Sequence, residues 1–267
     1  MSEPYGVTSD DRVVRAWSVR RLPFEPTGWR KDYREDLRRA LRSLEPVAGT
    51  HLRAEYASPD REFADVENVL LYNVGASNYR HLTVGGLEVE RTISADALHH
   101  VSYRLQTDST QVRPAAEPRA QVALSEFPSE REKPGSWWAA MRERLVTTGT
   151  PLEGEYTIDV RLRGDVQAFM SLVKPMLDGL VSALHVHDGS HEQHVRAALA
   201  RYGEPNRLWN LLGDPATALL GKRTLIRPHS QGVAWNPADD VCRGFSVRPS
   251  TTGPLIEATV RAESPPP

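Results

Sequence analysis

The sequence predicts an α/β or α+β protein built from two related α/β halves that pack as a pseudo-dimer. Segments with apolar residues at alternate positions, typical of strands, are interspersed with segments whose apolar residues recur every three or four positions, typical of helices. The hydrophobic fraction of 39% and the charged fraction of 25% are those of an ordinary globular protein. A pattern in the first half of the chain also recurs in the second half.

The first half, residues 12–105, opens with a strand and a long helix. The helix is expected from Trp29 to Leu44, because apolar residues recur along it at spacings of three and four until Pro46 and Gly49 end it. A second helix is expected to open at Asp65. The other elements predicted in this half are strands at Val13–Val19, His51–Tyr56, Leu87–Thr92 and His100–Leu105, with a loop at Leu22–Gly28 and a turn at Ser58–Glu62.

Residues 106–136 contain four prolines and few large apolar residues, which predicts a linker or long loop. The second half, residues 137–262, contains a strongly apolar helix at Val166–His185 that Pro175 is expected to kink. Its other predicted elements are helices at Trp137–Leu145, His194–Tyr202 and Arg207–Leu212, strands at Tyr156–Arg163, Thr224–Arg227, Gly244–Val247 and Ile256–Val260, and a frayed tail at Ser264–Pro267.

An internal repeat relates the two halves. The helix opening at Trp29 reads WRKDYREDL, and the one opening at Trp137 reads WWAAMRERL. The later segments DVENVL at Asp65 and DVQAFM at Asp165 also match, in the same order. We interpret the matches as a duplication; a chance match between amphipathic helices is the alternative.

Several function classes are excluded or disfavoured by what the sequence lacks. It has no apolar run of the roughly 18 residues that span a bilayer, so we expect a cytoplasmic protein without membrane contact. The single cysteine, Cys242, excludes an intrachain disulfide. Glycine-rich nucleotide-binding loops and the Gly-x-Ser-x-Gly elbow of hydrolases are also missing.

Acidic residues stand where two of the helices begin. Asp65 is separated by one residue from Glu67, and Asp165 occupies the matching position of the second half. Mg²⁺ prefers oxygen ligands and is often held by one or two carboxylates, so a third acid such as Glu88 or Glu90 could complete a site. Capping of the helix N-termini is the alternative role for the two aspartates.

These residues resemble the motif of the RusA-type Holliday junction resolvases, in which Asp-x-Asp-Asn precedes a lysine, a helical Asp-Ala-Leu and a paired acid. Asp65-Val-Glu-Asn is similar to the first part, and Lys174-Pro-Met-Leu-Asp-Gly-Leu with Asp188 is similar to the later part. The sequence departs from the motif where Leu71 replaces the lysine of the first half and Gln167 replaces an acid of the second.

The resemblance implies a fused pair of small α/β nucleases that normally act as homodimers on branched DNA. It implies that Asp65, Glu67, Asp165 and Asp188 lie near a Mg²⁺ ion and that Lys174 stabilises developing charge. The departures put a complete set of ligands in doubt in each half, so one or both sites could have become inactive.

Histidines cluster between His185 and His194. His185, His187, Asp188, His191 and His194 fall within ten residues, and such ligands suit Zn²⁺ or Mn²⁺. We consider a His-cluster metal hydrolase, with His185 and His187 as ligands. A polar, solvated connection between helices is the alternative.

Basic residues line one face of the helix that starts at Trp29. Arg34, Arg38 and Arg42 could contact the phosphates of DNA in a salt-sensitive way. A solvated face with local ion pairs is the alternative.

The leading functional hypothesis is a DNA-associated protein similar to a Mg²⁺-dependent endonuclease, active or degenerate. A non-catalytic scaffold that binds a protein partner is the main alternative, and the sequence leaves the oligomeric state open. A further acidic pair, Asp239-Asp240, lies in a predicted turn and could join a site, although an Asx-type turn explains it more simply.

Overall fold

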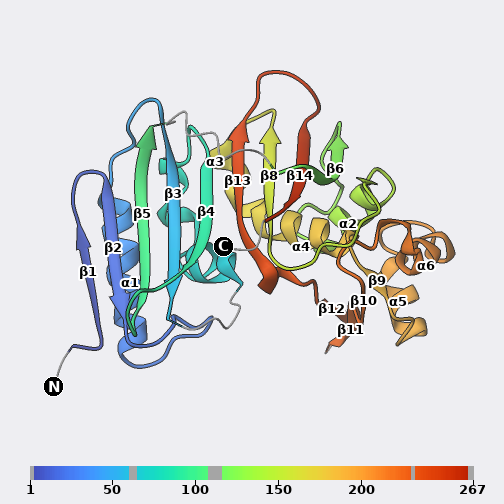
Figure 1. Cartoon of the computed structure of the whole chain (residues 1–267), viewed down its shortest axis with the longest axis horizontal. Helices are drawn as coiled ribbons and strands as arrows, with labels where there is room; N and C mark the ends of the chain where they lie inside the picture. Colours follow the sequence, from blue (N-terminus) through green and yellow to red (C-terminus); the bar gives the residue numbers. More distant parts are fainter. Residues whose placement is uncertain (1–2, 60–64, 108–115, 230–231, 264–267) are drawn as a thin grey trace. The chain divides into compact units, whose positions relative to one another are not determined.

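The computed structural model confirms the predicted mixture of helices and strands (Figure 1). It describes residues 3–59, 65–107, 116–229 and 232–263. The predicted tail at Ser264–Pro267 and most of the predicted turn at Ser58–Glu62 lie outside these residues. None of the helices in the described ranges has the length and apolar character needed to cross a membrane.

The helices of the described residues are mostly short. The α-helices are α1 (Trp29–Ser43), α2 (Pro134–Arg142), α3 (Val166–Phe169), α4 (Val173–Ala183), α5 (Glu192–Leu199) and α6 (Pro205–Gly213). A π-helical turn, η1 (Asn68–Tyr72), and the 3₁₀ turns η2 (Ala76–Asn78), η3 (Arg80–Leu82), η4 (Met170–Leu172), η5 (Pro215–Thr217) and η6 (Asp239–Val241) complete the set.

The strands occur before, between and after these helices. In chain order they are β1 (Tyr5–Ser9), β2 (Val13–Ser18), β3 (Thr50–Ser58), β4 (Leu87–Ile93), β5 (His99–Thr107), β6 (Pro118–Leu124), β7 (Val146–Thr147), β8 (Tyr156–Leu162), β9 (Val186–His187), β10 (Lys222–Arg223), β11 (Ile226–His229), β12 (Gly232–Trp235), β13 (Cys242–Pro249) and β14 (Ile256–Ala262).

Two compact units divide the chain, and they do not follow the expected halves. Unit 1 contains Met1–Ala115, Thr157–Ser171 and Asp240–Thr251, and unit 2 contains the rest. The order of helix, strand and helical segment does recur, as α1, β3 and η1 and again as α2, β8 and α3. The pseudo-dimer itself stays a prediction.

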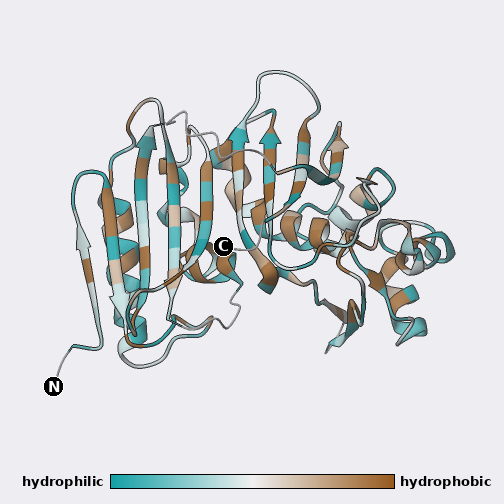
Figure 2. Ribbon diagram, in the orientation of Figure 1, coloured by the Kyte–Doolittle hydropathy of each residue, from teal (hydrophilic) through white to brown (hydrophobic). Residues whose placement is uncertain are grey.

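Unit 1 is built on a sheet with the strand order β1-β2-β5-β3-β4-β13-β8. Strand β3 pairs in parallel with β4 and antiparallel with β5. Its residues alternate, with Leu52, Ala54 and Tyr56 buried and Arg53 and Glu55 on the opposite face, and Figure 2 shows this banding along the strands. Helix α1 packs against β1 and β2.

Unit 2 combines the strands β14-β6-β7 with helices α2, α4, α5 and α6. Helices α2 and α4 approach closely at Gly179, where a Cβ atom would clash with the Cβ of Trp137. The buried guanidinium of Arg142 holds the ends of α4 and α6 together. It donates hydrogen bonds to the backbone carbonyls of Ala183, His185, Leu211 and Asp214.

Two predicted elements differ from the structure, and some strands were not predicted. The expected loop at 106–136 contains β6, which pairs antiparallel with β14. The expected single helix at Val166–His185 is interrupted by η4 and restarts at Val173. The restart places Pro175 in the first turn of α4, where a missing N–H breaks no intrahelical hydrogen bond. Strand β1, which the sequence did not predict, pairs with β2.

Candidate metal site

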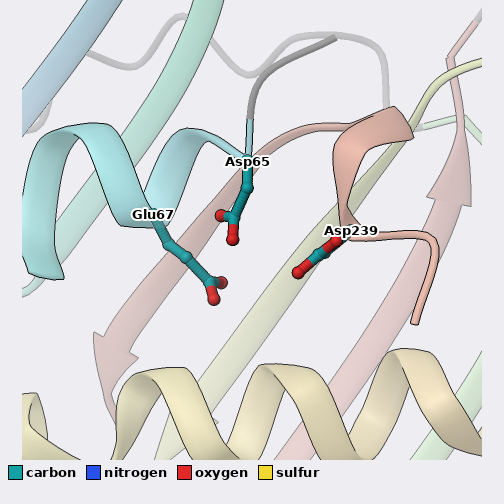
Figure 3. Close-up of side chains that lie close together, drawn as sticks. All are labelled: Asp65, Glu67 and Asp239. Atoms are coloured by element: carbon teal, nitrogen blue, oxygen red, sulfur yellow. The ribbon is translucent and has the colours of Figure 1, made fainter. Parts of the chain in front are cut away.

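Three carboxylates from two distant segments of the chain lie close together. One oxygen from each of Asp65, Glu67 and Asp239 lies within 4.8 Å of the others. Glu67 is buried, whereas Asp65 and Asp239 are partly exposed. Figure 3 shows the side chains directed toward one another, two from the helical segment and one from η6. We call these three residues the acidic cluster.

The carboxylate of Asp65 is held by the helical turn that it begins, and Glu67 lies two residues further along the same turn. The backbone N–H and the side-chain amide of Asn68 both donate to Asp65, the former over 3.2 Å. The N–H of Asn73 donates to the carbonyl of Asn68 across five residues, which makes this a π-type turn, a form that is frequent at functional sites. A residue of strand β5 also stabilises the turn, since the hydroxyl of Tyr103 donates to the carbonyl of Leu70 over 2.6 Å.

Asp239 is positioned through both of its neighbours in the chain. The N–H of Ala238 donates to Nε2 of His185 over 3.2 Å. The carbonyl of Ala238 accepts from the hydroxyl of Tyr156 over 2.9 Å. The carbonyl of Asp240 accepts from the guanidinium of Arg91 over 2.8 Å, just before the chain enters β13. The short turn η6 is therefore held at both sides of the carboxylate.

The cluster concentrates negative charge beside buried groups. Burial, and secondarily the charge of Glu67, raise the pKa of the Cys242 thiol well above its usual range. Burial and Glu67 raise the pKa of Tyr79 in the same way. Carboxylate oxygens are the ligands that Mg²⁺ and Mn²⁺ prefer, so the donor set of the acidic cluster suits either cation.

The predicted third acid of the site is not the one that the structure brings in. Glu88 and Glu90 take part in an ion-pair network on the sheet of unit 1, in which Arg53 lies 2.9 Å from Glu88 and 2.7 Å from Glu90. Arg248 also pairs with Glu88, and Arg243 with Glu90. A hydrogen bond from His51 is the main cause that lowers the pKa of Glu88. Asp239, which the sequence offered only as part of a turn, takes the third place.

The remaining acids and the lysine of the predicted site have local partners. Asp165 caps α3 by accepting from the N–H of Gln167 over 2.8 Å. Asp188 accepts from the N–H and hydroxyl of Ser190 and from Thr224, and these bonds hold its pKa well below the usual range. Lys174 lies 3.2 Å from Asp178, one turn further along α4. In the described part of the chain, none of these residues belongs to a group of three or more potential ligands.

The histidine cluster does not form the expected metal site. Nδ1 of His185 lies 3.3 Å from the carbonyl of Gly221, while Nε2 accepts from Ala238. Nε2 of His187 lies 2.8 Å from the carbonyl of Ser190, while Nδ1 accepts from the N–H of Leu225. Because both ring nitrogens of each histidine face backbone groups, neither ring has a nitrogen left for a metal. The prediction that His185 and His187 are ligands is therefore not supported.

The exposed histidines of the same stretch are placed differently. His191 adopts a left-handed backbone conformation (φ 56°) immediately before α5, and His194 is exposed on that helix. The set does not converge on one point among the described residues.

Two of the three arginines expected to contact phosphates hold the fold together. Arg38 donates to the carbonyls of Val74 and Asn73 over 2.8 and 3.1 Å and to Glu35 over 2.6 Å. Arg42 donates to the side chain of Asn78 over 2.6 Å. These bonds tie α1 to the segment that follows the acidic pair. Arg34 is partly exposed, and its role in DNA binding stays a prediction.

Comparison with protein-family models, with curated proteins and with solved structures finds no match to this chain.

Proposed function

We propose that the protein binds a divalent cation, Mg²⁺ or Mn²⁺, at the acidic cluster and hydrolyses phosphodiester bonds of DNA. The observation that carries the proposal is the approach of Asp65, Glu67 and Asp239 to within 4.8 Å of one another. A cation bound there would polarise a scissile phosphate and lower the pKa of a coordinated water molecule. The protein would contribute the three carboxylates as oxygen ligands.

The choice of DNA as substrate rests on the sequence. Asp65 and Glu67 are the acids of the segment that resembles the RusA-type motif. Branched DNA is therefore the first substrate to test, and a DNA substrate agrees with the cytoplasmic location that we expect. The cation site and the DNA substrate are separate parts of the proposal, and the experiment separates them.

The test measures Mn²⁺ binding by calorimetry and cutting of labelled branched and linear DNA. Asp65→Asn, Glu67→Gln and Asp239→Asn should each weaken Mn²⁺ binding by about tenfold or more, since removing even a residue that only supports a metal ligand weakens binding by this much. Each should also abolish metal-dependent cutting. Asp165→Asn is the matched control, because asparagine caps a helix as well as aspartate does.

Each outcome has a definite meaning. Mn²⁺ binding that depends on the cluster, without cutting of any DNA, would retain the cation site and overturn the nuclease assignment in favour of a non-catalytic partner-binding protein. If Mn²⁺ does not bind to the parent protein, or binds equally well to the three variants, both parts of the proposal fail.

A further inference from the structure

Two aromatic rings stack on each other at the surface of unit 1. The ring centroids of Phe24 and Tyr72 are 4.9 Å apart, and the ring planes are inclined by 17°. Each residue is more than half exposed, Phe24 by 56% and Tyr72 by 51%. Large aromatic side chains are usually buried, so an exposed stacked pair calls for an explanation.

The pair is held in place by its surroundings. Phe24 lies in the loop between β2 and α1, and buried Leu22 anchors this loop. The side-chain amide of Asn73, the residue after Tyr72, donates to the carbonyl of Leu22 over 3.1 Å. This bond ties the loop of one ring to the turn of the other. The stacked geometry is therefore present before any ligand binds.

Positive charge lies in the same loop. Arg20 and Arg21 are exposed, and within the described ranges neither side chain forms a hydrogen bond or an ion pair. They differ in this from Arg38 and Arg42, whose guanidinium groups hold parts of the fold. Glu25 is the acid that follows Phe24 in the loop. The loop therefore presents two arginines available to phosphates beside one carboxylate.

We propose that Phe24 and Tyr72, with Arg20 and Arg21, form a stacking platform for the unpaired bases of single-stranded DNA. Aromatic side chains bind bases of any sequence through their π-faces, and nearby arginines contact the backbone. A protein partner fits less well, because two rings present far less area than the roughly 1,000 Å² of a stable interface.

The platform is also placed suitably for the acidic cluster, a point that rests on the proposed function. Tyr72 ends the same helical segment that Asp65 begins. Even at the α-helical rise of about 1.5 Å per residue, the segment is no longer than roughly 10 Å. That length is about three stacked nucleotides at 3.4 Å each. A base on the platform would thus bring a phosphate a few nucleotides away toward the cluster.

The test uses a fluorescently labelled oligonucleotide of about 12 nucleotides, titrated with the full chain in EDTA, so that the cation site has no influence on binding. Phe24→Leu and Tyr72→Leu keep the apolar character and remove the rings. Each should weaken binding about 5- to 100-fold, the usual effect of removing one stacking partner. Ile93→Ala, another exposed apolar position, is the matched control and should bind like the parent.

Two further measurements identify the binding mode. Replacement of Arg20 and Arg21 by glutamine should lower the dependence of log affinity on log salt by about 0.7 for each phosphate that the protein no longer neutralises. An oligonucleotide carrying 2-aminopurine should be quenched by the parent and not by Tyr72→Leu.

The proposal is overturned if the parent does not bind single-stranded DNA, if it binds duplex DNA or RNA of the same length more tightly, or if the leucine variants bind like the parent. Because the titration contains no metal, the two proposals fail separately. Ring-dependent binding without metal-dependent cutting would refute the proposed nuclease alone. Cutting without ring-dependent binding would refute the platform alone.

Discussion

His185 links the pH of the solution to the stability of the segment that carries Asp239. Its ring is buried, and its Nε2 atom accepts the hydrogen bond from Ala238. Protonation would turn this acceptor into a donor directed at another donor. Burial first, and then the charge of Arg223, lower the pKa of His185 from 6.5 to about 4. The perturbation that tests this is His185→Gln, compared with the parent at two pH values.

The sign and size of the effect follow from the two pKa values. Below pH 6.5 the unfolded chain takes up a proton at His185, whereas the folded protein does so only near pH 4. The unfolded state is therefore favoured as the pH falls, and stability present above pH 6.5 is lost toward pH 4. The whole loss is about 3 kcal/mol, because one pKa unit corresponds to about 1.4 kcal/mol. About 2 kcal/mol of it falls between roughly pH 7.5 and pH 5.

The assay is urea unfolding at these two pH values. Other groups also titrate, so the quantity of interest is the difference between parent and variant. The parent should lose about 2 kcal/mol more than His185→Gln over this range. His194→Gln, at an exposed position, should behave like the parent. If His185→Gln loses as much stability as the parent does, the buried neutral imidazole is not the cause and the reasoning is wrong.

Two further substitutions test what holds the site region. Arg142→Met removes the buried guanidinium that donates to four backbone carbonyls. Two of these carbonyls keep a second donor, Ala183 from Thr217 and Leu211 from the N–H of Asp214, so the free energy of unfolding should fall by about 3 kcal/mol. The control is Arg144→Met, at a nearby exposed position, which should lower the free energy of unfolding in urea by less than about 1 kcal/mol. If the two variants lose equal stability, the role given to Arg142 is wrong. Tyr156→Phe removes the hydroxyl that holds Ala238 and should weaken Mn²⁺ binding about three- to tenfold, with a loss of stability near 1 kcal/mol. Calorimetry that finds unchanged Mn²⁺ affinity would show that this bond does not position Asp239.

The elements with strong periodicity were predicted well. The helix expected from Trp29 is α1, and its buried residues Tyr33, Leu37 and Leu41 are the apolar positions that predicted it. The strand expected at Tyr156–Arg163 is β8, with its alternation intact. In both elements one face is buried, so the sequence pattern directly records the environment of each residue.

Strand β6 was missed because its pairing partner lies far along the chain. Prolines and charges around it suggested a loop, and its core positions, Ala120, Val122 and Leu124, form only a short alternation. Pro118 begins the strand, a position at which proline is tolerated. The partner β14 buries these residues, and the residues around β6 carry no pattern that predicts the pairing.

The histidines show a different limit of the sequence. Their residue types and spacing suited a metal, and the prediction was chemically reasonable. What decides their role is which backbone groups meet the ring nitrogens. For His185 these come from Gly221 and Ala238, each more than thirty residues away. An imidazole ring whose two nitrogens both hydrogen-bond to backbone groups stabilises the fold and has no free lone pair to bind a metal.

The two matching aspartates illustrate how much of a site depends on the long-range fold. In the sequence, Asp65 and Asp165 both precede a helical segment, and both accept hydrogen bonds from its backbone as caps do. Local structure therefore does not distinguish them. Asp65 differs because Glu67 follows it where Asp165 is followed by Gln167, and because η6 brings Asp239 beside it. A capping aspartate becomes a candidate ligand only when the topology adds further carboxylates, and Asp65→Asn tests that second role because asparagine retains the cap and removes the charge.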